Sequence, residues 1–356
     1  MFPCFQLQDC PIFLGPLADT FSVWLEKQNH SQVFVLADEH TRQVCLPHFL
    51  KQTEISEKII VTEIKSGERA KNLATCEKIW QAMLSAHLDR KALVVNLGGG
   101  VIGDMGGFCA ATWKRGVDFV QIPTTLLAMT DAAIGGKTGI DFHGIKNTIG
   151  VFQQPAAVFV DPVFLQTLPE HELRSGFAEV LKHAVIGDPE LLRQLSGFRK
   201  LSENSAEHWL GILQKSIAVK VRVAQEDPLE KGLRVLLNFG HSIGHALESF
   251  FLETGHSLTH GEAVYIGMVC ESPPRLAPGK RNLRAEVLEL GQYVFPHKKI
   301  DPSAFPAIWT LMQQDKKNSS GTVRMAVPDE EPFSLKIIEP TQKDVERGLA
   351  FYNSLG

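Results

Sequence analysis

The chain has 356 residues, with 36 lysines and arginines, 40 aspartates and glutamates and a formal net charge of −4. This balance gives no basic field for nucleic acid, and the six cysteines form neither CxxC pairs nor a dense disulfide framework. No uninterrupted apolar run could span a bilayer, and the opening residues lack the positive segment of a signal peptide. We therefore predict a cytoplasmic protein that binds neither nucleic acid nor membrane. Its length predicts two domains, because single cores stop growing near roughly 250 to 300 residues.

The first half of the sequence alternates short β-type runs with helical segments, which is the pattern of an α/β domain with a largely parallel sheet. The helical period takes over after residue 169, with few β-type runs before the tail near residues 323–327. Long helices are expected at 169–189 and 209–225. The predicted strands are residues 32–37, 59–64, 92–97, 119–122 and 157–160.

Three glycines, Gly98, Gly99 and Gly100, follow a buried β-type run and open a helical segment in a GxGxxG pattern that ends at Gly103. Bare backbone amides in that position can approach a pyrophosphate, and the amino terminus of a helix favours its charge. Asp38, after the first β-type run, suits a ribose hydroxyl, although a helix cap or turn is an open alternative. Because the acid precedes the glycines, we predict a dinucleotide site of variant topology, with a structural glycine turn as the alternative.

A glycine-rich segment at residues 135–150 contains Lys137, Lys146 and Asn147. Its GKT sequence is not a phosphate-binding P-loop, because Asp131 stands where that motif requires its first glycine. We predict a flexible loop whose two ammonium groups and amide suit an anionic substrate, with an ordinary solvated surface loop as the alternative.

His241 and His245 stand four residues apart in an apolar helical segment, so both imidazoles project from one face about one turn apart. His260 follows a glycine-containing turn and predicts a third metal ligand, with His256 as a rival for that place. Three protein ligands with one open position are typical of catalytic zinc. Glu179, among apolar neighbours in the helix that begins near residue 169, is a further candidate oxygen ligand; a surface ion pair is its alternative.

Seven ordered motifs resemble the 3-dehydroquinate synthase family, over a stretch that runs from about residue 38 to residue 317. They are GGGVIGD (98–104), RGVDFVQIPTTLL (115–127), GGKTGID (135–141), KNTIG (146–150), SGFAEVLKH (175–183), LNFGHSIGH (237–245) and HGEAV (260–264).

The resemblance implies an NAD-binding α/β domain at residues 1–162 and an all-α metal- and substrate-binding domain at 163–356. It also implies a lyase of the shikimate pathway, which converts 3-deoxy-D-arabino-heptulosonate 7-phosphate to 3-dehydroquinate and phosphate. The expected course is transient oxidation by NAD, phosphate elimination, re-reduction and internal aldol closure, so that NAD is used catalytically. The expected metal is zinc or cobalt, and the expected assembly is a homodimer.

The resemblance also assigns site residues, and it gives His245 to the substrate rather than to the metal. The implied metal ligands are Glu179, His241 and His260. The implied catalytic residues are Asp131, Lys137, Lys182, Lys220, Asn238 and His245. Substrate binding is implied for Arg115, Lys146, Asn147, Arg234 and Lys316, with Lys317 as an alternative to the last. Cofactor binding is implied for Asp38, Glu68, Lys71, Gly98, Gly99, Gly100, Asp104, Thr124 and Thr125.

The sequence departs from the family pattern at two places. His40 stands where the family usually has asparagine, and the proline-rich stretch at 272–279 breaks a helix expected to continue. Two other enzymes remain as alternatives: a cyclase for a different phosphorylated sugar, and a metal-dependent polyol dehydrogenase. The set of lysines and arginines favours a substrate that carries both a phosphate and a carboxylate.

Overall fold

A computed structural model describes residues 4–55, 59–143, 145–228, 230, 232–255, 258–273, 281–314 and 322–356. The chain packs as two compact units, each built from two separate stretches of sequence. The first unit is Met1–Pro169 together with Asn204–Val221, and the second is Glu170–Glu203 together with Arg222–Gly356. The single division predicted after residue 162 therefore did not anticipate that residues 204–221 pack with the first unit. Among the described helices, none has the length and apolar character needed to cross a membrane.

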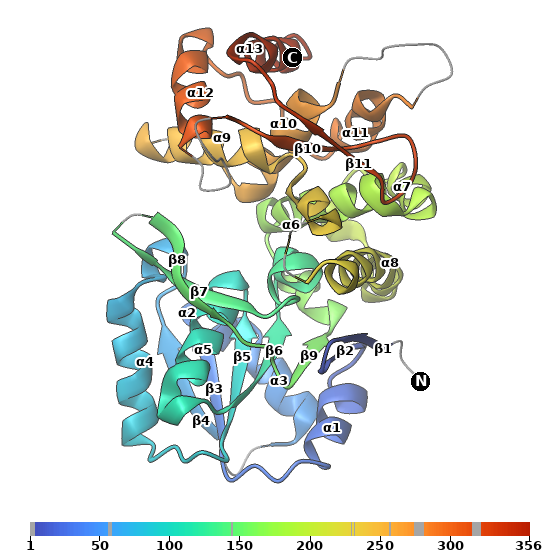
Figure 1. Cartoon of the computed structure of the whole chain (residues 1–356). Coiled ribbons are helices and arrows are strands. Elements are labelled where there is room, and N and C mark those ends of the chain that lie inside the picture. The colour runs from blue at the N-terminus through green and yellow to red at the C-terminus, as the bar shows by residue number, and fades with distance from the viewer. Residues whose placement is uncertain are drawn as a thin grey trace. The chain divides into compact units, whose positions relative to one another are not determined.

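A seven-stranded sheet forms the centre of the first unit (Figure 1). All neighbouring strands in it run parallel except the first two, which form an antiparallel hairpin at one edge. Each strand predicted from the sequence is present, with ends that differ by at most two residues. In sheet order the strands are β1 (Cys4–Leu7), β2 (Cys10–Leu14), β9 (Ala157–Val160), β6 (Asp118–Pro123), β5 (Leu93–Gly98), β3 (Val33–Asp38) and β4 (Ile59–Ile64).

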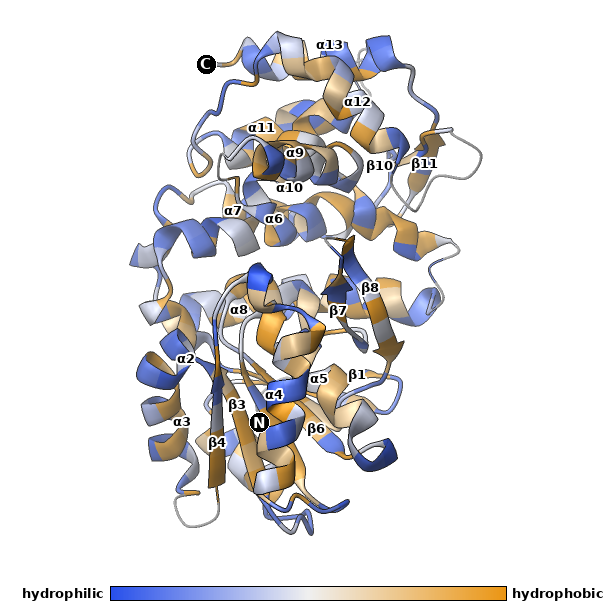
Figure 2. Cartoon of the chain, turned by 90° about the vertical axis from the view of Figure 1, so that its left-hand side faces the viewer, coloured by the Kyte–Doolittle hydropathy of each residue, from blue (hydrophilic) through white to orange (hydrophobic). Residues whose placement is uncertain are grey.

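Helices cover both faces of this sheet, and the central strands are coloured as hydrophobic in Figure 2. Helices α4 (Leu73–Ser85) and α5 (Gly100–Thr112) pack on the face that carries Phe34. Phe49 of α3 (Leu46–Thr53) packs at a tilt against Phe21, and Phe159 of β9 packs edge-to-face against the same ring. The remaining helices of the unit are α1 (Val23–Leu25), α2 (Glu39–Val44) and most of α8 (Ala206–Glu226).

The order of the strands explains how an acid can precede the glycine fingerprint. Strand β3 continues through α2 and α3 to β4 on one side of the sheet, whereas β5 continues through α5 to β6 on the other. The carboxyl ends of β3 and β5 are neighbours, so this is the point where the winding direction reverses. Ligands of open α/β sheets bind at such a switch point.

The glycine-rich segment expected to be a flexible loop is instead an antiparallel hairpin of β7 (Lys137–Phe142) and β8 (Ile145–Phe152). Gly139 lies opposite Gly150, and a side chain at Gly139 would come within 2.6 Å of the Ile149 carbonyl oxygen. The prediction was wrong because these glycines give the two strands room to approach each other.

The second unit is helical, apart from a two-stranded hairpin formed by the β-type tail. Helix α10 (His260–Glu271) is its centre: from Ala263 to the end every residue is buried, as in a helix enclosed on all sides. Four other helices pack around it, namely α6 (Glu170–Gly187), α9 (His241–Glu253), α11 (Leu283–Gly291) and α13 (Gln342–Asn353). The unit also contains α7 (Pro189–Leu195), α12 (Phe305–Gln313), β10 (Met325–Pro328) and β11 (Leu335–Ile338).

The helix that the proline-rich stretch was expected to break does end there. Helix α10 stops at Glu271, and Ser272 follows in extended conformation. Residues 274–279 lie outside the described part of the chain.

Candidate active site

Three helices of the second unit bring Glu179, His241 and His260 together. The Glu179 carboxylate is fully buried, and its Oε1 lies 3.6 Å from Nε2 of His241 and 3.8 Å from Nε2 of His260. These separations exceed an ordinary N–H···O hydrogen bond. They are close to the roughly 3.4 Å expected between two ligands of one tetrahedral ion with bonds of about 2.0–2.1 Å. The arrangement therefore fits a divalent metal.

The other ring nitrogen of each histidine already has a partner. Nδ1 of His241 is 3.3 Å from the Phe239 carbonyl oxygen, and Nδ1 of His260 is 3.1 Å from Oε2 of Glu248. Because both partners are acceptors, each Nδ1 donates its hydrogen, so Nε2 of each ring is the nitrogen that faces Glu179. Lone pairs on these nitrogens would repel the carboxylate oxygen, so a positive charge, either a proton or a metal ion, has to lie between them. This is a second reason why the three side chains suit a metal.

The electrostatics of the cluster favour positive charge. Desolvation alone would lower the pKa of His260, but the carboxylates of Glu179 and Glu248 outweigh it and raise the pKa to about 10. Lys182, almost fully buried, forms an ion pair with the second oxygen of Glu179 and donates to the Leu237 carbonyl oxygen at 2.6 Å. Lys182 is thus fixed beside the predicted metal ligands.

Glycines set the close approach of the helices that carry these ligands. A Cβ on Gly261 would collide with the carbonyl oxygen of Ser175 in α6, and one on Gly267 would collide with that of Gly240. Gly240 itself has a φ of +83°, which only glycine adopts without strain. The buried Glu271 of α10 holds the start of α9 by accepting from the backbone amides of Gly240 at 2.7 Å and Ile243 at 2.8 Å.

Adding one methyl group at Gly261 should therefore damage the metal centre. We expect Gly261→Ala to move α10 away from α6, lowering metal content severalfold and destabilising the protein by about 1–3 kcal/mol, as overpacking does. Gly211→Ala is the control, since a Cβ there meets nothing within 4 Å and the helix should gain stability slightly. Metal analysis and thermal unfolding of both variants give the measurement. Equal metal content in the two would show that the helix spacing is not critical.

His245 lies in α9, the helix of His241, but it is not part of the group that Glu179 forms with His241 and His260. Its ring centroid is 5.1 Å from that of His241, and its ligating atom groups with Glu248 and His260 instead. The simple expectation from the HxxxH spacing, that both helix histidines bind the metal, therefore does not hold in the geometry. A role for His245 toward the substrate stays a prediction.

Two further predicted residues lie in the short helix η7 (Leu233–Asn238). Arg234 is only 5% exposed, and its guanidinium donates to the Pro228 carbonyl oxygen at 3.1 Å. No described carboxylate pairs with this guanidinium. Asn238 donates to Oε1 of Glu230 at 3.0 Å. A buried guanidinium with a carbonyl as its partner suits an anionic ligand.

The predicted cofactor residues of the first unit gather at the carboxyl ends of β3, β5 and β6. Gly98 ends β5, Gly99 is the N-cap of α5, and Thr124 donates its backbone amide to the Gly98 carbonyl oxygen at 3.0 Å. A Cβ on Gly99 would lie 3.0 Å from Cγ2 of Thr125. The bare glycines at this helix terminus leave the backbone open to a pyrophosphate, so the site fits a dinucleotide.

Asp38, the predicted ribose acid, also caps a helix. Its Oδ1 accepts from the backbone amides of His40 at 3.0 Å and Thr41 at 2.8 Å, at the start of α2. The alternative considered from the sequence, a helix cap, is therefore correct. It does not exclude cofactor binding, because all the side-chain contacts recorded for Asp38 fall on one of its two oxygens.

Glu68, Lys71 and Asp104 form a charged cluster nearby. The buried ammonium of Lys71 lies 2.6 Å from Oδ2 of Asp104, 3.8 Å from Oε1 of Glu68 and 2.5 Å from Oδ1 of Asn147. Burial raises the pKa of Asp104 to about 6, against the opposing effect of Lys71. Asn147, which the resemblance gives to the substrate, thus contacts a predicted cofactor residue.

The remaining predicted residues divide into three groups. Lys220 of α8 forms an ion pair with Asp131 in η4 (Ala128–Ala132), all within the first unit. Lys137 and Lys146 are exposed on the β7–β8 hairpin. Lys316, its alternative Lys317 and the rival ligand His256 lie outside the described residues.

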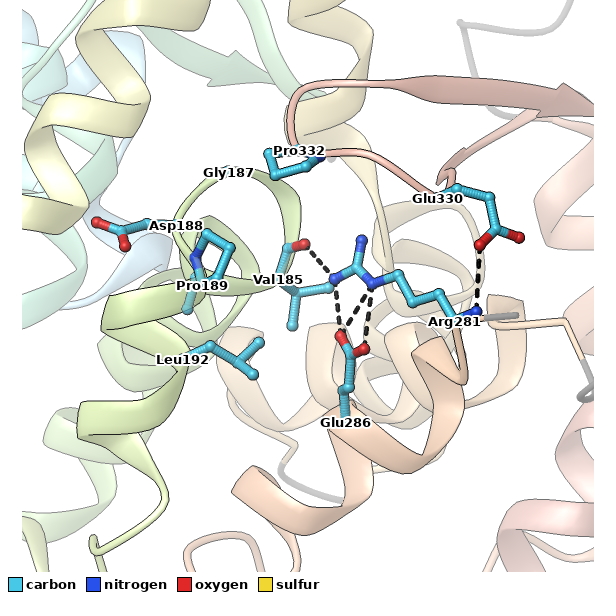
Figure 3. A pocket seen from close by; sticks show the side chains of 10 residues that line it. Val185, Gly187, Asp188, Pro189, Leu192, Arg281, Glu286, Glu330 and Pro332 are labelled. Atoms are coloured by element: carbon cyan, nitrogen blue, oxygen red, sulfur yellow. Dashed lines mark hydrogen bonds and ion pairs between the residues drawn. The ribbon is translucent and has the colours of Figure 1, made fainter. Parts of the chain in front are cut away.

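A small pocket in the second unit contains none of the predicted site residues (Figure 3). Arg281 crosses it and donates to both oxygens of Glu286, to the Val185 carbonyl oxygen at 2.6 Å and to the Asp329 carbonyl oxygen at 3.1 Å. Because these donors are already engaged, the arginine ties α6 and α11 to the segment before β11. The pocket is therefore a stabilising junction.

Comparison with known proteins decides the family. A model described as the 3-dehydroquinate synthase N-terminal region matches residues 61–175, and one for the C-terminal region matches residues 176–318. The chain belongs to the 3-dehydroquinate synthase family. The predicted family, and with it the predicted activity and lyase class, are thereby confirmed.

Curated 3-dehydroquinate synthases support the same conclusion. The sequence is 42% identical to that of Prochlorococcus marinus (strain MIT 9211), over 75% of this chain and 73% of that protein. It is 45% identical to that of Thermosynechococcus vestitus (74% and 73% covered) and 36% identical to that of Parabacteroides distasonis (85% and 86% covered).

Solved structures confirm the predicted fold class. The 2-epi-5-epi-valiolone synthase ValA from Streptomyces hygroscopicus, solved with NAD⁺ and Zn²⁺ bound, matches with a TM-score of 0.83 and 26% identity over all of both chains. A 2-deoxy-scyllo-inosose synthase, complexed with carbaglucose-6-phosphate, NAD⁺ and Co²⁺, has the same TM-score at 20% identity, covering 98% of this chain and 100% of that one. This second likeness shows the fold alone.

Two carboxylates beside the 3-dehydroquinate synthase motifs were not identified from the sequence. Glu248 follows His245 by three residues, a spacing that puts both on one helix face and could have singled it out. Glu271 lies eleven residues after His260, and nothing in its local sequence indicates that it holds the start of another helix.

Proposed function

We propose that the chain is a working 3-dehydroquinate synthase, which converts 3-deoxy-D-arabino-heptulosonate 7-phosphate to 3-dehydroquinate and phosphate. The observation that carries this proposal is the convergence of Glu179, His241 and His260 in a chain whose relatives are 3-dehydroquinate synthases. A phosphorylated sugar-like substrate is consistent with the ligand of the 2-deoxy-scyllo-inosose synthase.

Separate sets of side chains would bind the metal and the cofactor. Glu179, His241 and His260 would hold a divalent metal, zinc or cobalt, while Asp38, Glu68, Lys71, Asp104 and the glycine turn would hold NAD. When bound, the metal would supply a Lewis acid and NAD would supply a hydride acceptor.

The cationic residues would bind the charged ends of the substrate. Arg234 is buried with only a carbonyl as its partner among the described residues, which suits the substrate's carboxylate or phosphate. Lys137, Lys146 and Asn147 on the hairpin would supply further cationic and amide donors, Lys182 would supply one beside Glu179, and Asn238 would supply an amide. His245 carries an imidazole, a group that can both accept and donate a proton, and we assign it to proton transfer with the substrate.

The central test is phosphate release with NAD accounting. Purified protein incubated with the heptulosonate phosphate, NAD and zinc should release many equivalents of phosphate per NAD, because the oxidation is reversed within each turnover. Absorbance at the NADH band should show no lasting rise. NADH accumulating in proportion to product would instead favour the polyol dehydrogenase. If no phosphate were released from the heptulosonate phosphate while metal and NAD were bound, the proposed reaction would be refuted.

We also propose a homodimer in which Arg115 contributes to the partner's phosphate site. Arg115 is exposed at the end of η3 (Trp113–Arg115), where Lys114, Arg115 and Gly116 all have positive φ. A left-handed backbone is costly for the two non-glycine residues, so the turn holds an unfavourable conformation that presents the guanidinium to solvent. The cytoplasmic location predicted from the sequence stays a prediction.

A further inference from the structure

Glu248 joins the two helices that carry the histidine ligands, although the sequence motifs give it no role. It lies in α9, seven residues after His241, and its carboxylate reaches His260 at the start of α10 with Oε2 3.1 Å from Nδ1. Its side chain is 14% exposed, against 26% for His260. A carboxylate this poorly solvated forms a stronger hydrogen bond than one on the surface.

The two histidines are held in unequal ways. Nδ1 of His241 faces a neutral backbone carbonyl, whereas Nδ1 of His260 faces the charged Glu248. A carboxylate on Nδ1 does two things: it keeps the hydrogen on that nitrogen, and it pushes electron density toward Nε2. Both effects act on the nitrogen that faces Glu179.

We propose that Glu248 is a positioning residue for the metal centre: it fixes the tautomer and ring orientation of His260 and makes Nε2 a stronger ligand. This inference rests on the proposed metal site formed by Glu179, His241 and His260. It assigns Glu248 no contact with the metal or the substrate.

A second metal site that includes Glu248 as a ligand is the alternative to a positioning role. Ligand atoms of His245, Glu248 and His260 also lie within 4.8 Å of one another, so the three could hold a cation of their own. The metal stoichiometry distinguishes the two. A positioning role requires one tightly bound ion per chain, whereas a separate site requires two, of which one disappears when Glu248 is changed.

The test measures cobalt affinity in a graded pair of variants. Glu248→Gln keeps an acceptor oxygen but removes the charge, and Glu248→Ala removes both. Glu253→Gln is the matched control, because Glu253 is an exposed carboxylate in the last turn of the same helix. Cobalt would be titrated into metal-free protein against a chelator, using the visible absorption of the bound ion and metal analysis after desalting. Unfolding of the metal-free proteins would be measured in parallel.

We expect Glu248→Gln to weaken cobalt binding about 10-fold and Glu248→Ala about 100-fold, the range for lost outer partners of ligating histidines. The control should match the wild type. Metal-free Glu248→Gln should lose only a little thermal stability, through the weakened hydrogen bond to His260, and the loss of cobalt affinity should exceed that loss of stability, which separates positioning from a general structural role. Affinity within twofold of wild type in Glu248→Gln, or loss of a second ion, would overturn the proposal. If the wild type bound no cobalt tightly, the proposed metal centre itself would fail.

Discussion

Changing His241 to alanine should abolish both metal binding and turnover. The His241 imidazole would supply one of the three proposed metal ligands, the others being Glu179 and His260, and two remaining ligands would hold a catalytic ion poorly. We expect less than a tenth of the wild-type metal content after desalting. Phosphate release should fall at least about 10³-fold, which corresponds to about 4 kcal/mol of lost transition-state stabilisation. Normal metal content together with normal turnover in His241→Ala would refute the assignment.

His245→Ala is the matched control, because it removes an imidazole one turn along the same helix. It should keep nearly normal metal content, since His245 lies outside the group around Glu179, yet it should lose rate through the missing proton transfer. Chelation of the wild type should abolish activity, and added zinc or cobalt should restore it. Equal metal loss in both variants would mean that His245 is also a ligand.

The contrast between these histidines marks the limit of prediction from spacing. An interval of four residues places His241 and His245 on one helix face, but it does not say which ring faces a third element. That choice depends on α6, which carries Glu179, and on glycines that let α10 approach both helices. The pairing arises from tertiary packing, and only the family resemblance could indicate it beforehand.

The parallel sheet was predictable because its strands are short runs rich in β-branched and aliphatic residues. β3, β5 and β9 are buried almost throughout and β6 is buried after Asp118, whereas the edge strand β4 is mostly half-buried but keeps the same β-type composition. The β1–β2 hairpin was missed because its strands are short, contain Pro11 and lie at the sheet edge, where the pattern is weak. The hairpin at 137–152 was missed for a different reason. Its glycines resemble loop residues, whereas Gly139 and Gly150 allow two strands to approach closely.

Residues 204–221 show the same limit at the level of domains. Helix α8 is one uninterrupted segment of helical period, and the sequence groups it with the helices that follow. Its first part nevertheless packs with the first unit, where Lys220 pairs with Asp131 from a segment distant in sequence. Such pairs between distant residues have no local signal.

The proposed dimer predicts how much activity should return when two different inactive variants form mixed dimers. Arg115→Ala should be nearly inactive, because a guanidinium forms two parallel hydrogen bonds with phosphate that no neighbouring group can replace. His241→Ala should be inactive for the separate reason given above. A dimer of one chain of each kind would contain one site with its own intact His241 and an intact Arg115 from the partner subunit.

Co-refolding the two variants in equal amounts should therefore recover up to about a quarter of the wild-type activity. Random pairing makes about half of the dimers mixed, and each mixed dimer has one complete site of two. Differently tagged chains would show by tandem purification that mixed dimers are present, and phosphate release would measure their activity. Refolding each variant alone is the control and should give no recovery. If purified mixed dimers stay inactive, Arg115 acts in its own subunit's site or outside the site, because only an arginine that crosses between subunits can complement in this way.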